Sequence, residues 1–128
     1  MQPRAPTVLI VDDDPAFCVI MREFLGGDGF EVHLAFDVPQ ALSFLAFVTP
    51  DLILSDIMMP EIDGLWLVRS LRSAPSTSNI PTIVISAKAM PEDRIAAIEA
   101  GADAFVSKPF SMVELRQVIS EFLPTALH

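Results

Sequence analysis

Five short apolar runs alternate with five segments of helical period, and this alternation constrains the fold more than any other feature of the chain. The runs are rich in Val, Ile and Leu, with uninterrupted stretches such as VLIV and IVI. Continuously apolar strands are typical of a parallel sheet covered by helices on both faces. The predicted strands lie near 7–12, 31–36, 51–56, 81–86 and 103–107, and the predicted helices near 15–26, 38–48, 64–73, 91–100 and 111–122. We therefore expect an α/β fold, an open, doubly wound three-layer sandwich with a parallel five-stranded sheet.

Residues with special backbone preferences support the predicted helix ends. Pro15 fits the first position of a helix whose N-cap is Asp14. Gly101 follows the fourth predicted helix, where a left-handed residue is favoured. Ser111 and Glu114 have the spacing of a capping box for the last helix.

Chain length and charge narrow the class of protein. At 128 residues the chain can bury one core but not two, so we expect a single domain over residues 1–128 with its core at about 7–122. Residues 123–128 would then be a tail or the start of a linker. Eight Lys and Arg residues against seventeen Asp and Glu residues give a formal net charge of -9. Direct nucleic-acid binding is not expected, because it needs a clustered basic surface.

Cysteine usage and hydropathy point to a soluble, cytoplasmic protein. The single cysteine, Cys18, cannot form an internal disulfide, and no Cys/His spacing indicates zinc. No apolar run approaches the roughly 18 residues of a membrane-spanning helix. The N-terminus also lacks the pattern of a signal peptide. No membrane association is therefore expected.

Polar residues stand where four of the five predicted strands end. They are Asp12 and Asp13 after the first strand, Asp56 after the third, Ser86 at the end of the fourth and Lys108 after the fifth. The carboxyl ends of parallel strands lie at one edge of the sheet, where such folds bind ligands. We therefore expect three acids, a hydroxyl and a cation to lie close together.

These residue types suit phosphoryl chemistry. Three clustered carboxylates repel each other unless a cation neutralises them, and Mg²⁺ can bridge carboxylate and phosphate oxygens. Lys108 adds a compact positive charge for a phosphoryl oxygen, and Ser86 adds a hydrogen-bond donor. An aspartate can itself be the nucleophile and form an aspartyl-phosphate.

Four motifs resemble the receiver domain of two-component response regulators, the CheY-like family. They are VLIVDDDP (8–15), PDLILSDIMMPEIDG (50–64), TIVISAKA (82–89) and AGADAFVSKPF (100–110). The resemblance extends from about residue 7 to residue 122, with all motifs in order. It implies a flavodoxin-like sheet with strand order 2-1-3-4-5.

The resemblance also implies a metal and a phosphoacceptor. Asp56 would accept the phosphoryl group, and the cofactor would be Mg²⁺, with Mn²⁺ as a substitute. The implied metal ligands are Asp12, Asp13, Asp56 and the backbone carbonyl of Met58.

The remaining family roles concern the response to the phosphoryl group. Lys108 would contact it, Ser86 would detect it, and Phe105 stands where the family keeps a switch aromatic. Many relatives have Tyr at that position, but this chain contains no Tyr, so a switch at Phe105 would act through packing alone. The resemblance also implies a cis peptide between Lys108 and Pro109.

The function implied by the resemblance is signal transduction. A histidine kinase or a histidine phosphotransfer protein would donate the phosphoryl group to Asp56. Phosphorylation would then shift the face formed by the fourth helix, fifth strand and fifth helix towards a downstream effector. Such a domain is not an enzyme in the usual sense, because it catalyses at most its own phosphorylation and dephosphorylation.

Three further residues indicate a partner surface. Trp66 lies on the side of the third predicted helix opposite to its apolar face, and an exposed tryptophan suggests a contact site. Cys18 and Val19 are apolar residues at first-helix positions that are usually polar in such domains. We expect Cys18 and Val19 to form an apolar face that contacts a phosphodonor or a second copy in a homodimer.

One alternative is a phosphatase of the haloacid-dehalogenase type, which also uses Mg²⁺. Asp12 and Asp14, separated by one residue after an apolar strand, resemble its nucleophile and acid. Four observations oppose this interpretation. Asp14 is better explained as a helix cap, no acidic pair follows Lys108, the chain is short for the class, and Asp56 would have no role.

A second alternative is an interaction module that keeps the receiver fold but is never phosphorylated. The chain has every residue type that phosphorylation needs at the predicted sheet edge. This opposes the second alternative, because a module without phosphoryl chemistry needs none of them. The residues concerned are Asp12, Asp13, Asp56, Ser86 and Lys108.

Overall fold

Five parallel strands form one sheet in the order β2-β1-β3-β4-β5, as predicted. The computed structural model describes residues 4–59 and 61–123. Its strands are β1 (Thr7–Val11), β2 (Glu31–Ala35), β3 (Leu52–Ser55), β4 (Thr82–Ser86) and β5 (Ala104–Ser107). Its helices are α1 (Pro15–Gly27), α2 (Val38–Leu45), α3 (Gly64–Ser73), α4 (Pro91–Ala100) and α5 (Met112–Ser120).

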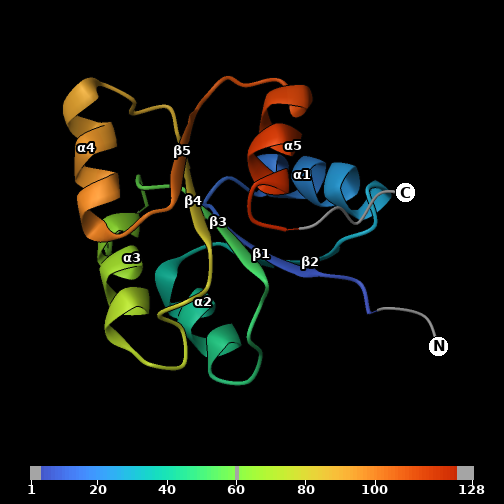
Figure 1. Cartoon of the computed structure of the whole chain (residues 1–128), viewed down its shortest axis with the longest axis horizontal. Helices are drawn as coiled ribbons and strands as arrows, with labels where there is room; N and C mark the ends of the chain where they lie inside the picture. Colours follow the sequence, from blue (N-terminus) through green and yellow to red (C-terminus); the bar gives the residue numbers. More distant parts are fainter. Residues whose placement is uncertain (1–3, 60, 124–128) are drawn as a thin grey trace.

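The helices cover both faces of the sheet and complete the expected three-layer sandwich. Helices α1 and α5 lie on one face, and α2, α3 and α4 lie on the other (Figure 1). Because strand side chains alternate between faces, Val8 and Ile10 of β1 pack with α1 and α5. Leu9 and Val11 of the same strand pack with α2 and α3. Both faces of the central strands are therefore buried, which explains their continuous apolar sequence.

The helix ends follow the predicted caps. Asp14 accepts hydrogen bonds from the backbone N–H groups of Ala16 and Phe17. Gly101 ends α4 with a φ of 117°, a left-handed conformation that costs glycine little. Ser111 Oγ accepts the N–H of Glu114 at 3.0 Å and so caps α5. These three residues therefore mark the start of α1, the end of α4 and the start of α5, as predicted.

Two helices end earlier than predicted. Helix α2 stops at Leu45, not near residue 48, and α5 stops at Ser120, not near residue 122. Beyond α2 the chain runs into Thr49 and Pro50, and the residue before a proline is disfavoured in helical conformation. The predicted tail at 123–128 lies outside the described residues except for Leu123, which is buried.

An arginine joins α3 to the two loops beside β4, a contact that the sequence did not predict. Arg72 donates from Nε to the Gly101 carbonyl and from Nη1 to the Ile80 carbonyl, both at 2.9 Å. Its Nη2 donates to Asp103 Oδ2 at 2.7 Å, and the same oxygen accepts the N–H of Thr82. Planar guanidinium groups suit such multiple contacts. This network fixes the start of β4 against the loop that precedes β5.

Candidate functional site

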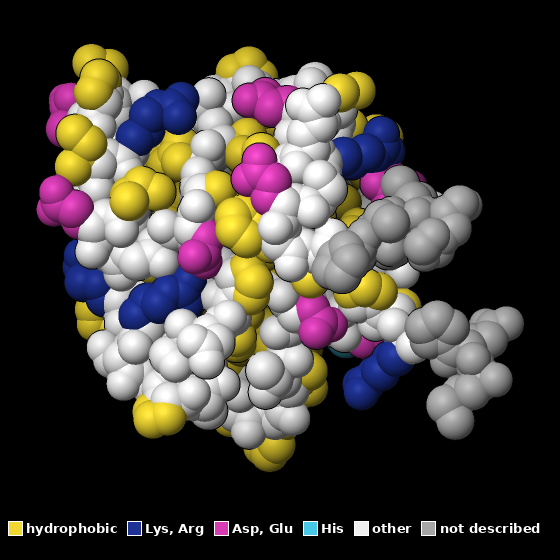
Figure 2. All heavy atoms as spheres, in the orientation of Figure 1, with side chains coloured by type: hydrophobic (Ala, Val, Ile, Leu, Met, Phe, Trp, Pro, Cys, Tyr) yellow, Lys and Arg dark blue, Asp and Glu magenta, His cyan; other side chains and the backbone are white. Residues whose placement is uncertain are grey.

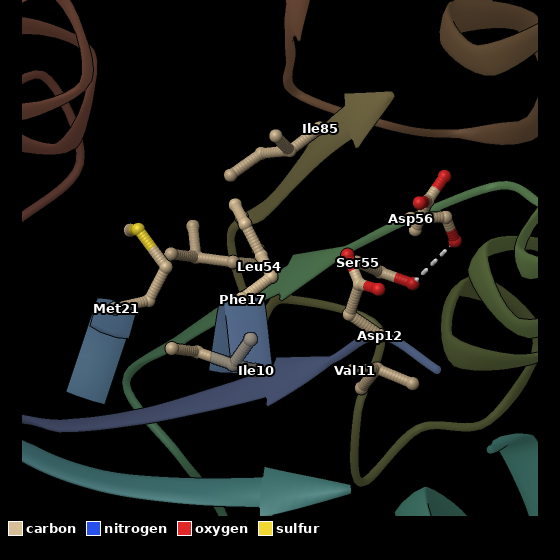
Figure 3. A pocket seen from close by; sticks show the side chains of 9 residues that line it. All are labelled: Ile10, Val11, Asp12, Phe17, Met21, Leu54, Ser55, Asp56 and Ile85. Atoms are coloured by element: carbon tan, nitrogen blue, oxygen red, sulfur yellow. Dashed lines mark hydrogen bonds between the residues drawn. The ribbon is translucent and has the colours of Figure 1, made fainter. Parts of the chain in front are cut away.

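Strand register places Asp12 and Asp56 side by side at the carboxyl edge of the sheet. Val11 and Ser55 are Cα partners in the pairing of β1 with β3, and each aspartate is the next residue along its strand. Figure 3 shows both carboxyl groups beyond the apolar side chains that line the interior. Ser86 and Ser107 are likewise partners in β4 and β5, and Lys108 is the next residue, so it lies at the same edge of the sheet.

Lys108 joins the two aspartates. Its ammonium donates to Asp12 Oδ2 at 2.8 Å and to Asp56 Oδ2 at 3.1 Å. The two aspartates are 2% and 8% exposed. Charged groups that are buried this far need a partner, because leaving water disfavours the ionised form. The structure thus brings together three of the residues predicted for the site.

Burial and charge shift the pKa values of this cluster. Burial raises the pKa of the Asp12 carboxyl above its ordinary value, although the hydrogen bond from Lys108 works in the opposite direction. Burial alone would lower the pKa of Lys108. The hydrogen bond to Asp12 and the charges of Asp56 and Asp12 outweigh it, so the Lys108 pKa is raised. The lysine is therefore held in its charged form.

Backbone contacts fix the loop that carries Asp56. The N–H of Asp56 donates to the Val11 carbonyl at 3.0 Å, and the N–H of Met58 donates to Asp56 Oδ1 at 3.0 Å. Further along, the N–H of Gly64 donates to the Ile57 carbonyl at 2.9 Å. A Cβ atom on Gly64 would lie 1.9 Å from the backbone oxygen of Asp56. Only glycine allows α3 to start this close to the aspartate.

We expect Gly64→Ala to disturb this loop. Its Cβ would collide with backbone, which cannot rotate away, so the free energy of unfolding should fall by about 3 kcal/mol. Gly26→Ala in α1 is the matched control, because no atom lies within 4 Å of a Cβ there. The control should stabilise the protein by about 0.5–1 kcal/mol. Urea denaturation measures both, and equal effects would contradict the close approach.

Ser86 and Phe105, the two residues expected to act as a switch, lie in the neighbouring strands β4 and β5. Ser86 is fully buried, and its Oγ accepts the N–H of Lys88 at 3.0 Å. Phe105 is partly buried, and the Arg94 guanidinium lies over its ring, 4.8 Å from the centroid. Arg94 Nε also donates to the carbonyl of Ala89 in the β4–α4 loop. Arg94 therefore connects the loop after Ser86 with the Phe105 ring, a link that the sequence analysis missed.

The donor set at this edge fits a hard divalent cation. Asp12 and Asp56 offer only oxygen ligands when ionised, and two carboxylates against one ammonium leave one net negative charge. Asp13 is exposed, as is the side chain of Met58. Across residues 4–59 and 61–123, no group of three or more His, Cys, Asp or Glu side chains is already gathered as a metal centre. Roles for Asp13 and the Met58 carbonyl remain predictions.

The predicted partner surface needs one correction. Trp66 and Val19 are 43% and 41% exposed, but Cys18 is fully buried and belongs to no surface. Cys18 precedes Met21 and Leu25 by three and seven residues, so all three face the core, and one step along the helix turns Val19 outward. The Cys18 thiol donates to the Asp12 carbonyl, and its burial, followed by the nearby Asp12 charge, raises its pKa to about 11.

The position of Asp14 bears on the phosphatase alternative. Its carboxylate is exposed and accepts the N–H groups of Ala16 and Phe17. A catalytic acid would have to point into the buried site beside Asp12 and Lys108. The geometry therefore favours Asp14 as a helix cap.

In the described residues no helix is long and apolar enough to cross a membrane.

Comparison with known proteins identifies relatives over nearly the whole chain. The family model described as response regulator receiver domain matches residues 8–120. The response regulator MprA of Mycobacterium avium is 40% identical over 108 residues, which are 84% of this chain and 46% of that protein. The chain thus spans about half the length of the curated relatives it matches.

Solved structures agree in fold and include a magnesium complex. The receiver domain of a histidine kinase from Syntrophus aciditrophicus is 34% identical, with a TM-score of 0.86 over 93% of this chain and 90% of that one. The receiver domain of the sensor histidine kinase PA1611 from Pseudomonas aeruginosa is 28% identical, with a TM-score of 0.85 over 93% of this chain and 98% of that one. The PA1611 structure has a magnesium ion coordinated in its active site cleft.

Proposed function

Because the chain belongs to the family of response regulator receiver domains, we propose that it is a phosphoacceptor that takes a phosphoryl group onto Asp56. The donor would be the phosphohistidine of a histidine kinase or a histidine phosphotransfer protein, in a cytoplasmic two-component pathway. The observation that carries the proposal is the Lys108 ammonium held between the buried carboxylates of Asp12 and Asp56. This arrangement combines a nucleophile with a fixed counter-charge.

In the proposed phosphoryl transfer the protein mainly positions the reacting groups and neutralises their charge. A carboxylate oxygen of Asp56 would form a bond to phosphorus while the bond between phosphorus and the donor imidazole nitrogen breaks. The Lys108 ammonium would neutralise part of the negative charge on the phosphoryl oxygens. The Met58 N–H would keep the Asp56 carboxylate oriented. Asp12, Asp56 and, by family resemblance, Asp13 and the Met58 carbonyl would hold Mg²⁺. When bound, the ion would supply further neutralisation of the phosphoryl oxygens.

The proposed response is a two-state shift at the face formed by α4, β5 and α5. The Ser86 hydroxyl would turn from the Lys88 N–H towards the phosphoryl oxygens and move the β4–α4 loop. Arg94 and Phe105 would carry that movement to the exterior of α4, where hydrophobic side chains gather (Figure 2). The exposed residues there include Met90, Ile95 and Ile98. A downstream effector, or a second copy in a homodimer, would contact this face.

One experiment tests the proposed function. The protein is incubated with Mg²⁺ and acetyl phosphate, and intact mass is recorded before and after treatment with base. We expect one base-labile phosphoryl group per chain and no labelling when EDTA removes the metal. Repeated turnover with Asp12 as the nucleophile would favour a phosphatase. No labelling under either condition would favour an interaction module that is never phosphorylated.

The second prediction concerns Asp13 and Asp14, which follow Asp12 directly and are expected to have different roles. Asp13→Ala should abolish Mg²⁺-dependent labelling, because it removes one proposed ligand. Asp14→Ala should leave labelling intact and lower the free energy of unfolding by about 1 kcal/mol, because Ala16 and Phe17 lose their capping acceptor. Labelling and urea denaturation of both variants test whether Asp13 acts as a metal ligand and Asp14 as a helix cap. Equal loss of labelling in the two variants would contradict these roles.

A further inference from the structure

The Lys108 ammonium has a third neighbour besides the two carboxylates. An ammonium group has three N–H donors, and two of them are directed to Asp12 Oδ2 and Asp56 Oδ2. Its nitrogen also lies over the ring of Phe17, 4.1 Å from the centroid. A cation over an aromatic face is attracted by the negative face of the ring. The ammonium is therefore enclosed by two charged acceptors and one aromatic face.

The Phe17 ring is itself fixed in place. Its residue lies in the first turn of α1, where its N–H donates to the Asp14 cap at 3.3 Å. The ring meets that of Phe110 at 6.2 Å between centroids with an interplanar angle of 86°, the edge-to-face arrangement that aromatic pairs prefer. Phe110 follows Lys108 by two residues, so the same chain segment supplies both the cation and the second ring. Helix α1 and the segment after β5 are joined through this stack.

We infer that Phe17 is a positioning residue for the proposed phosphoryl transfer: its ring face holds the Lys108 ammonium at the carboxylates of Asp12 and Asp56. The inference rests on the proposed function, because it assigns Phe17 a role in that same site. Phe17 touches no reacting atom and acts through the lysine alone.

The aromatic face suits this task better than an aliphatic or a charged neighbour. An aliphatic side chain would exclude water from the ammonium without any attraction in return. A third carboxylate would bind the ammonium and compete with incoming phosphoryl oxygens. The ring attracts the cation weakly and accepts no conventional hydrogen bond. The ammonium can therefore turn towards new oxygens on Asp56 while it keeps its place over Phe17.

Three variants separate this role from ordinary core packing. Phe17→Leu keeps an apolar side chain but removes the ring, whereas Phe17→Tyr keeps the ring face. Phe24→Leu makes the same change at an exposed position of the same helix. The first readout is the initial rate of labelling by acetyl phosphate at saturating Mg²⁺. The second is the ¹³C–¹H signal of the Lys108 ε-methylene, which is simple to assign because the chain has only one other lysine, Lys88.

The expected pattern is specific. Phe17→Leu should slow labelling about fivefold, and Phe17→Tyr should restore the rate to within about twofold of the wild type. Phe24→Leu should label at the wild-type rate. The ring current should shift the Lys108 methylene protons upfield of those of Lys88 in the wild type and in Phe17→Tyr. That shift should be lost in Phe17→Leu.

Two outcomes would overturn the inference while the proposed function stands. One is labelling of Phe17→Leu at the wild-type rate. The other is equal slowing in Phe17→Leu and Phe17→Tyr, which would indicate packing and not the ring face. Absence of labelling in the wild type would instead overturn the proposed function, and with it any role of Phe17 in the reaction. The lysine methylene signal would still report in that case whether the ring contact exists.

Discussion

Asp56→Asn is expected to reduce phosphoryl incorporation below detection under conditions that label the wild type fully. The amide has the shape of the carboxylate but lacks its nucleophilic oxygen anion, so no aspartyl-phosphate can form. The amide oxygen can still accept the Met58 N–H, and Lys108 keeps its contact with Asp12. The loop should therefore remain folded. Intact mass with acetyl phosphate and Mg²⁺ measures the loss.

A matched control separates loss of the nucleophile from loss of structure. Asp63→Asn makes the same change in the same loop, where the side chain caps α3 by accepting the Trp66 N–H. Asparagine caps helices about as well as aspartate, so this variant should be labelled like the wild type. Incorporation that persists in Asp56→Asn and maps to Asp12 would contradict the assignment. Circular dichroism of both variants checks that they are folded.

Lys108→Met is expected to have the second large effect, on stability as well as on labelling. The variant leaves the buried carboxylates of Asp12 and Asp56 without their counter-charge. Removing one partner of a buried pair typically costs several kcal/mol, so we expect the free energy of unfolding to fall by about 3 kcal/mol near neutral pH. Labelling should slow as well, because no cation from the chain would meet the phosphoryl oxygens.

The free energy of unfolding should depend on pH differently in the wild type and in Lys108→Met. In the wild type the raised Lys108 pKa contributes stability that is fully present below the ordinary value of 10.5 and lost as the pH rises through the folded value. In Lys108→Met the hydrogen bond and the charge that lower the Asp12 pKa in the wild type are removed, so burial raises this pKa further above its ordinary value of 3.8. The folded variant then binds protons that the unfolded chain does not. Its stability should therefore fall more steeply with pH than that of the wild type.

Urea denaturation at about pH 5 and about pH 8 measures this difference, which should be larger at the higher pH. Lys88→Met is the control, because Lys88 is an exposed lysine paired with Asp93 at 3.5 Å. Exposed ion pairs contribute little, so its stability should change by less than about 0.5 kcal/mol. A similar, pH-independent loss in both lysine variants would contradict a special role for the Lys108 pair.

Sequence patterns were sufficient wherever the physical cause is local or periodic. The order and type of the elements followed from apolar runs and helical spacing, and Asp14, Gly101 and Ser111 marked helix ends because capping involves residues two to four apart. The convergence of Asp12, Asp56 and Lys108 followed from one general property of parallel sheets. These expectations agree with the structure.

Sequence patterns were insufficient where the orientation of a side chain depends on tertiary packing. The prediction that Cys18 lies on a surface is wrong, because Cys18 is on the side of α1 that faces the sheet, and its side chain is buried in the core. No sequence pattern assigns Gly64 a role beyond its place at the start of the helix predicted at 64–73, because its role comes from the backbone of Asp56, eight residues earlier. A glycine in the short loop between a buried strand and a helix was the signal that could have identified it, because such a glycine often marks a close approach of backbone.

The alternating elements, the polar strand ends and the helix caps can be predicted from the sequence, because each depends on neighbouring residues or on a repeating spacing. The position of the Lys108 ammonium between two carboxylates and the Phe17 ring is known only from the folded chain. Lys108 and Asp12 are 96 residues apart. Their contact depends on strand order, register and side-chain rotamers together, and no local pattern encodes that combination.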